Sequence, residues 1–205
     1  MKPLTSEETV KFLAAAKGDR LEALYVLAVL SGARQGELFA LEWRDFDPAQ
    51  GTIRIRQSQQ DVNGVVKIAP TKTDTSRRQV YLPKIAVETL REHHERAVAQ
   101  KSPVGPDDRI FTAPEGGPLR RKNVLSRSFK PLLKRAEIPT TTRFHDLRHT
   151  YATELLTSGA DAKVIQAQLG HSKIGVTLDT YAHLMPSLAK GAVSKLDDAF
   201  GVPTR

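Results

Sequence analysis

The sequence predicts a mainly helical α+β domain with a small antiparallel sheet of three or four strands at one edge. Apolar residues recur at helical spacing before residue 43 and again after residue 83, whereas between these points they alternate with polar residues. With 205 residues, of which 40% are hydrophobic, the chain has enough apolar side chains for one well-filled core. We therefore expect one folded domain.

Three helices are expected at the start of the chain. Thr5 followed by Glu8 is a capping-box pattern ahead of the first helix. The nearly continuous apolar run over residues 21–30 indicates a buried second helix, which Gly32 interrupts. A short third helix over residues 34–41 then restarts the helical pattern.

From Trp43 the period of the apolar residues changes to two. The alternating segments are separated by polar turns and have the sequences TIRIRQS, VVKIAP and RRQVYLP. They indicate antiparallel strands. Residues 71–76 are expected to form a polar hairpin tip that carries Lys72, with Arg77 and Arg78 at its base.

Two helices are expected in the middle of the chain. Pro83 precedes a long helix that runs towards Val98. Residues 122–136 have the pattern of a basic amphipathic helix, which Pro131 is expected to kink because proline lacks the backbone N–H.

The remaining helices follow in close succession. One starts at His145, and Gly159 is placed to end it. The next begins after Asp161 as N-cap and stops at Gly170. A further helix is expected to carry Tyr181, and a last one near the C-terminus has an apolar side that needs a cover.

The charge balance indicates a polyanionic partner. The formal net charge is +8 and the sequence pI is about 9.8. Nucleic acid is favoured over an acidic membrane surface, and a basic protein without such a partner is the alternative. The absence of cysteine excludes disulfides, thiol catalysis and cysteine-ligated metals, and is compatible with a cytoplasmic protein.

Two arginines occupy positions where apolar residues are expected. Arg148 lies within the apolar side of its helix, with His145 one turn earlier, and Arg34 points the way its neighbouring leucines point. A buried guanidinium needs an anion, because it cannot lose its proton. Arg34 with Glu37 is compatible with a structural ion pair, but Arg148 has no evident partner, which favours a bound ligand.

A phosphodiester is the ligand that suits these residues. Its two non-bridging oxygens match two guanidiniums, and His145 and His171 can donate further hydrogen bonds to them. A tyrosine is then the candidate nucleophile, since neighbouring cations favour its phenolate, and a lysine can protonate the departing sugar hydroxyl. This chemistry cuts a nucleic-acid strand, stores the bond energy in a phosphotyrosine and needs neither a metal nor a nucleotide cofactor.

Five motifs of the chain resemble, in order and spacing, the catalytic domain of the tyrosine recombinases, also called phage integrases. They are GARQGEL, TKTDTSRR, HDLRHT, LGHS and TYAHL. The resemblance extends from about Leu4 to about Met185. It implies the tyrosine recombinase catalytic fold and site-specific cleavage and rejoining of double-stranded DNA.

The resemblance also implies a role for each matching residue. Arg34 and Arg148 would bind the phosphate and Lys72 would act as general acid. His145 and His171 would be the active-site histidines, Tyr181 the nucleophile that forms a 3′-phosphotyrosine, and Glu37 a supporting residue. Tyr181 follows His171 by ten positions, one more than in the best-known members of the family. Five basic residues are expected to contact DNA phosphates, namely Arg77, Arg78, Arg120, Arg121 and Lys122.

The resemblance places the catalytic domain over residues 1–185. Residues 186–205 would be a C-terminal helix and tail that docks on a neighbouring protomer in a tetramer on DNA, or folds back on its own domain. The N-terminal core-binding domain usual in the family is absent from this sequence, so we expect either a part of a longer protein or an unusually short member. In both cases we expect weak, non-selective DNA binding by this chain alone.

Several alternatives remain open at this point. A type IB topoisomerase would use the same chemistry as a monomer, and a catalytically silent DNA-binding module would use none of it. His145 and His149 lack the HExxH pattern, so we expect no zinc site. The other tyrosines lie in apolar or alternating segments and are interpreted as structural; they are Tyr25, Tyr81 and Tyr151.

Overall fold

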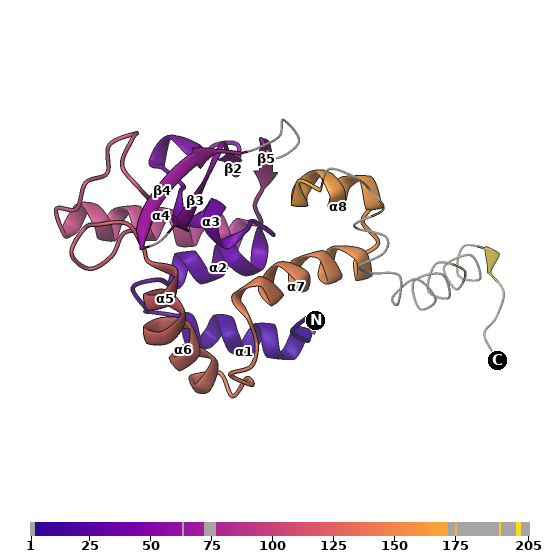
Figure 1. Cartoon of the computed structure of the whole chain (residues 1–205). Coiled ribbons are helices and arrows are strands. Elements are labelled where there is room, and N and C mark those ends of the chain that lie inside the picture. Colours follow the sequence, from indigo (N-terminus) through magenta and orange to yellow (C-terminus); the bar gives the residue numbers. More distant parts are fainter. Residues whose placement is uncertain are drawn as a thin grey trace.

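The computed structural model describes residues 3–62, 64–71 and 77–171, together with the single positions 175, 193, 200 and 201. This part of the chain is a mainly helical α+β fold in which the strands gather on one side and most helices pack below them (Figure 1). Lys72, Tyr181 and nearly all of the two helices expected after residue 171 lie outside the described residues.

The first three helices form where the sequence predicts them. The capping box ahead of the first is confirmed: the Thr5 hydroxyl accepts from the Glu8 N–H at 3.1 Å, and the Glu8 carboxylate accepts from the Thr5 N–H at 2.8 Å. Every residue between positions 23 and 29 is buried, so the second helix runs through the core. The three helices are α1 (Ser6–Ala16), α2 (Glu22–Leu30) and α3 (Gln35–Phe39).

Gly32 makes the turn between α2 and α3 possible. Its φ of 61° lies in the left-handed region that favours glycine. A Cβ atom at this position would lie 2.7 Å from the Leu169 Cδ2 atom and would also overlap the ring of Tyr151. Only a glycine therefore lets the chain turn this close to the C-terminal helices, and the turn leads directly into Arg34.

The strands are antiparallel as predicted, but they form two sheets instead of one. One sheet has the order β1-β2-β5 and the other contains β3 and β4. The strands are β1 (Phe46–Asp47), β2 (Thr52–Ile55), β3 (Gln57–Val62), β4 (Val65–Pro70) and β5 (Arg78–Tyr81), and a 3-10 turn, η1 (Trp43–Asp45), precedes them.

Burial explains why β5 pairs with β2 and not with β4. Ile53 pairs with Val80 in the register of β2 and β5, and both side chains are fully buried. In contrast, β3 and β4 meet at their turn in a pair of exposed valines, Val62 and Val65. Residues 71–76 therefore connect strands of two different sheets. The expectation that they form the tip of one hairpin is wrong, because the flanking strands pair elsewhere, β4 with β3 and β5 with β2.

The middle of the chain contains the long helix α4 (Lys84–Ala99) and a broken basic helix. The break is a π-helical turn, η3 (Leu125–Phe129), between α5 (Arg121–Val124) and α6 (Lys130–Arg135). Pro131 lies in the first turn of α6, where its missing N–H removes a hydrogen bond from the preceding turn. The predicted kink thus takes the form of a π-helical turn.

The last described helices are α7 (Phe144–Thr157) and α8 (Ala162–Leu169). Phe144 at the start of α7 joins an aromatic cluster with Phe12, Tyr25 and Phe129, with ring centroids 5.4–6.4 Å apart. In Figure 1, α8 lies beside α7 and across from β5. No helix in the described ranges is both long and apolar enough to cross a membrane.

Candidate active site

Arg34 occupies the N-cap position of α3 and is held by Glu37 on the same helix. Its backbone N–H donates to Glu37 Oε2 at 2.8 Å, and its Nη1 donates to Oε1 at 2.8 Å. The side chain of Glu37 is 3% exposed, whereas that of Arg34 is 42% exposed. Glu37 therefore orients the guanidinium from the protein side, and much of the cation remains open to solvent.

Arg148 lies in α7 with only 4% of its surface exposed. Its Nη1 donates to the carbonyl oxygen of Gly32, and its Nη2 donates to that of Leu169 at 2.7 Å. The expectation that Arg148 has no partner of its own is therefore wrong, because two backbone carbonyls accept from it. These bonds connect α7 to the turn before Arg34 and to the last residue of α8.

His171 follows directly on the end of α8. Gly170, the C-cap residue, has a φ of 66° and donates its N–H to the carbonyl oxygen of Gln166 at 2.9 Å. A Cβ atom on Gly170 would lie 2.9 Å from Nη1 of Arg78, so the chain leaves the helix in contact with this arginine. The carbonyl of His171 accepts from the Gln166 side chain at 3.1 Å. The helix end and the glycine together determine where His171 stands.

The positive charges of Arg34 and Arg148 act on both His145 and His171. Burial, followed by the charge of Arg148, lowers the pKa of His145, and Arg34 contributes as well. Burial and then the charges of Arg148 and Arg34 lower the pKa of His171 to about 4. Both imidazoles are therefore neutral at pH 7, and each has one N–H to donate. The same two cations act on both histidines, which come from different helices.

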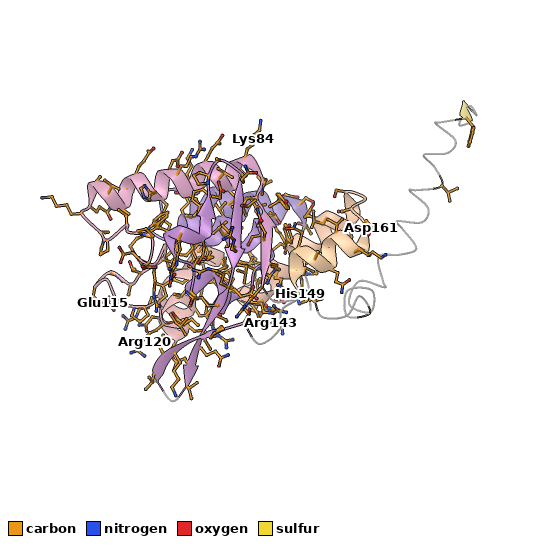
Figure 2. All side chains as sticks on the ribbon, turned by 90° about the horizontal axis from the view of Figure 1, so that it is seen from above. Lys84, Glu115, Arg120, Arg143, His149 and Asp161 are labelled. Atoms are coloured by element: carbon orange, nitrogen blue, oxygen red, sulfur yellow. The ribbon has the colours of Figure 1, made fainter. Side chains whose placement is uncertain are left out.

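A groove of about 950 Å³ opens at this site. Arg34 and His145 line it together with polar side chains of β3, the threonines of residues 140–142 and apolar side chains such as Phe39 and Leu125. Arg121 and Lys130 add positive charge along it. Arg143 also lines the groove, and Figure 2 shows it near His149 of α7. In the same view Arg120 lies towards the β3–β4 hairpin. A groove with arginine and histidine at one point and cations along its length suits a phosphate backbone.

The described tyrosines do not resemble nucleophiles. Tyr25 is fully buried and donates to the hydroxyl of Ser128 at 2.6 Å, and burial raises its pKa to about 12. Burial also raises the pKa of Tyr151. Tyr81 is 64% exposed on the edge of β5. A high pKa disfavours the phenolate that attack on phosphorus requires, so Tyr25 and Tyr151 fit the structural roles predicted for them.

The residues expected to contact DNA have different surroundings in the structure. Arg77, Arg121 and Lys122 are exposed. Arg120 is also exposed, and its Nη1 donates to the carbonyl oxygen of Gly64 at 2.7 Å, which holds the hairpin against α5. The side chain of Arg78 is only 5% exposed and its Nη2 donates to Glu37 at 2.9 Å. Arg78 therefore belongs to the interior of the site and not to its surface.

The alternation of residues along β5 predicts that Arg78 faces inward. Considering Arg77 and Arg78 only as a cluster of positive charge misses this difference. Arg78 precedes Val80 by two residues on β5, and Val80 is fully buried. Side chains two apart on a strand point to the same face, so the alternation favours an inward Arg78 and an outward Arg77. The threonines of residues 140–142 carry no comparable signal, because they follow Pro139 in a loop.

Comparison with known proteins places this chain in a family. The sequence profile of the phage integrase family matches residues 2–187. The tyrosine recombinase XerC-like protein of Caldanaerobacter subterraneus is 34% identical, over 96% of this chain and 54% of that protein. The ICEBs1 integrase of Bacillus subtilis is 32% identical, over 97% of this chain and 55% of that protein. The chain thus spans about half the length of these curated relatives.

Solved structures agree with the sequence matches. The Tn1549 transposon integrase in complex with transposon right end DNA has a TM-score of 0.79 and 25% identity, covering 95% of this chain and 66% of that one. The XerA recombinase has a TM-score of 0.76 at 24% identity, over all of this chain and 66% of that one, and shows the fold alone. The predicted fold class is confirmed, and the chain belongs to the phage integrase family of tyrosine recombinases.

Proposed function

We propose that this chain is the catalytic part of a site-specific recombinase that cuts and rejoins DNA strands through a phosphotyrosine. One observation carries the proposal: Arg34, His145, Arg148 and His171 gather from three separate segments of the chain, and Arg34 and His145 line the groove. No common structural need explains two arginines and two neutral histidines in one place, whereas a phosphodiester uses all four.

Each of these side chains has a proposed task at the scissile phosphate. The exposed guanidinium of Arg34 binds one non-bridging oxygen, and Arg148 binds the other. The neutral histidines donate N–H groups to the same oxygens, on which negative charge grows in the transition state. Arg34 is already oriented by the Glu37 carboxylate and Arg148 by backbone carbonyls. The two guanidiniums therefore need to move little when the phosphate binds.

The nucleophile and the general acid are proposed from the family motifs. Tyr181 would attack phosphorus to form a 3′-phosphotyrosine while the 5′ oxygen of the next nucleotide leaves. Lys72 would give that oxygen its proton. The reverse attack by a 5′ hydroxyl of another strand releases Tyr181 and seals the new junction, so no metal or nucleotide is needed.

Double-stranded DNA is the proposed partner. The net charge of +8 and the cations of the groove support it, and the Tn1549 integrase was solved with transposon DNA. Arg77, Arg120, Arg121 and Lys122 are proposed to contact phosphates. Four protomers on two duplexes would be needed for recombination, with residues 186–205 as a candidate contact between neighbours.

A nicked suicide substrate tests the proposal, because loss of a short fragment beyond the cut traps the covalent intermediate. We expect a protein–DNA adduct in the presence of EDTA that disappears in Tyr181→Phe. Tyr81→Phe is the matched control, since this exposed tyrosine lies outside the groove, and it should form the adduct normally. An adduct that persists in Tyr181→Phe would refute the nucleophile. No adduct in the wild type would favour a silent DNA-binding module.

A further inference from the structure

Arg78 forms a buried ion pair with Glu37 that none of the family roles uses. Its Nη2 donates to Glu37 Oε2 at 2.9 Å and its Nη1 to Oε1 at 3.2 Å. The two side chains are only 5% and 3% exposed. Arg78 begins β5 and Glu37 lies on α3, so this two-pronged contact joins the sheet to the helix that starts beside Arg34.

The charges of this cluster do not cancel. Glu37 carries one negative charge and accepts from two guanidiniums, Arg34 and Arg78. Arg78 is the buried partner and Arg34 is the partly exposed one. A buried carboxylate requires a cation, and Arg78 meets this need from inside the protein. The remaining positive charge therefore stays with the exposed Arg34, where an incoming phosphate can reach it.

The third nitrogen of the same guanidinium reaches α8. Nε of Arg78 donates to the carbonyl oxygen of Gln168 at 2.7 Å. This carbonyl belongs to the last turn of α8, where the helix has unsatisfied acceptors and favours positive charge. Gly170 packs against the guanidinium and precedes His171. Arg78 thus contacts the supports of both Arg34 and His171.

We propose that Arg78 is a positioning residue for strand cleavage: it neutralises Glu37, so that Arg34 keeps its positive charge for the scissile phosphate, and it holds the end of α8 that presents His171. The inference rests on the proposed function. It replaces the expectation from sequence that Arg78 contacts DNA, because Nε, Nη1 and Nη2 of its guanidinium all donate to Glu37 and Gln168 within the protein.

The titration behaviour of Glu37 agrees with this role. Burial alone would raise the pKa of Glu37, but the hydrogen bond and the charge of Arg78, and then the contacts of Arg34, lower it below its usual value. Glu37 is therefore ionised at neutral pH, and without Arg78 its charge would fall on Arg34 alone. An arginine fully neutralised by its own carboxylate stabilises less well the negative charge that grows on the phosphate in the transition state.

The test separates the rate of cleavage from the affinity for DNA. Arg78→Met removes the charge and keeps a side chain of similar length. At saturating suicide substrate we expect adduct formation to slow on the order of tenfold to a hundredfold, as for other mispositioned catalytic groups. The dissociation constant and its salt dependence should remain as in the wild type. A residue that binds DNA would instead lose affinity and reduce the salt slope by about 1.

A double variant tests the charge argument directly. In Glu37→Gln with Arg78→Met, the neutral amide no longer cancels the charge of Arg34, so the double variant should form the adduct faster than Arg78→Met. A purely structural pair predicts recovery of the free energy of unfolding only, because Glu37→Gln removes an uncompensated buried charge, and no faster adduct formation by the folded protein. Arg96→Met is the matched control: Arg96 pairs with Glu22 at 3.3 Å between α4 and α2, outside the groove, and its loss should leave the rate unchanged.

Arg78→Lys keeps the proposal testable if Arg78→Met does not fold. Lysine retains the charge but cannot donate to Glu37 and Gln168 with one planar group, so cleavage should still slow. The proposal is overturned if Arg78→Lys and Arg78→Met cleave at the wild-type rate, if affinity and salt slope fall instead, or if the double variant shows no recovery. A wild type without any adduct would refute the proposed function itself, and this inference with it.

Discussion

The hydrogen bond between Arg148 Nη2 and the carbonyl oxygen of Leu169, at 2.7 Å, joins two residues that are 21 positions apart. The same guanidinium holds the carbonyl of Gly32. A cation at the end of α8 stabilises the helix and orients the residue that follows it, His171. Arg148 is therefore a structural residue as well as a proposed ligand of the phosphate, and the two roles predict different effects.

Arg148→Ala should lose both activity and stability. Its removal leaves two buried carbonyl oxygens without their donor, and we expect the free energy of unfolding to fall by about 2–6 kcal/mol, since each lost charged hydrogen bond costs roughly 1–3 kcal/mol. Adduct formation should fall on the order of a hundredfold or more. Urea denaturation and single-turnover cleavage measure the two effects. A variant of wild-type stability would show that these carbonyl contacts contribute nothing.

Arg34→Ala should lose activity alone. Its side chain is 42% exposed, and Glu37 retains the buried Arg78 as its partner, so the fold keeps its charge balance. We expect cleavage to slow on the order of a hundredfold or more with a nearly unchanged denaturation midpoint. A normal single-turnover rate in this variant would contradict the proposed phosphate contact.

Gly32→Ala should destabilise the fold by about 2–5 kcal/mol, from left-handed strain together with overpacking. The added methyl group would overlap Tyr151 and the side chain of Leu169. Gly116→Ala is a matched control, because Gly116 also has a positive φ, 83°, but no atom within 4 Å of the added Cβ. It should cost only about 1–2 kcal/mol. Equal losses in the two variants would show that the close approach at Gly32 is unimportant.

Stability should fall as the pH drops from about 7.5 to 5. Burial and then the neighbouring His145 lower the pKa of His149 from 6.5 to about 4, so the unfolded chain takes up a proton over this range and the folded chain does not. His149 is expected to contribute about 2 kcal/mol to this loss, at about 1.4 kcal/mol per pKa unit. In His149→Gln the difference between the two pH values should shrink. Urea denaturation at both pH values checks this, and an unchanged difference would contradict it.

The groove should account for the salt dependence of DNA binding. Arg121→Ala and Lys130→Ala each remove one cation from its lining, and each should reduce the slope of log affinity against log salt by about 1. Lys84→Ala is the control, since Lys84 is exposed at the start of α4, away from Arg143 and His149 in Figure 2. Fluorescence anisotropy titrations at several salt concentrations measure the slopes. Equal slopes in all three variants would place the DNA elsewhere.

Much of the architecture follows from local pattern. Helix starts such as Thr5 with Glu8 and helix ends such as Gly170 depend on neighbours within four residues, so the sequence contains the whole cause. The family motifs likewise mark Arg34, His145, Arg148 and His171 as candidates, and the two arginines also stand out as charged residues at apolar positions. The pairing of β5 with β2 was not predicted, since strand pairing depends on which faces are buried together.

Long-range contacts account for the rest of the site. The carbonyls that hold Arg148 belong to Gly32 and Leu169, and backbone carbonyls are present at every residue, so no side-chain pattern marks these two. The contact of Arg78 with Glu37 spans 41 positions between a strand and a helix. The chain thus specifies by local pattern which groups can perform the chemistry. The tertiary structure decides which of these groups face the groove and which are buried and support the others. The physical reason is that burial and charge compensation depend on residues that come into contact only in three dimensions.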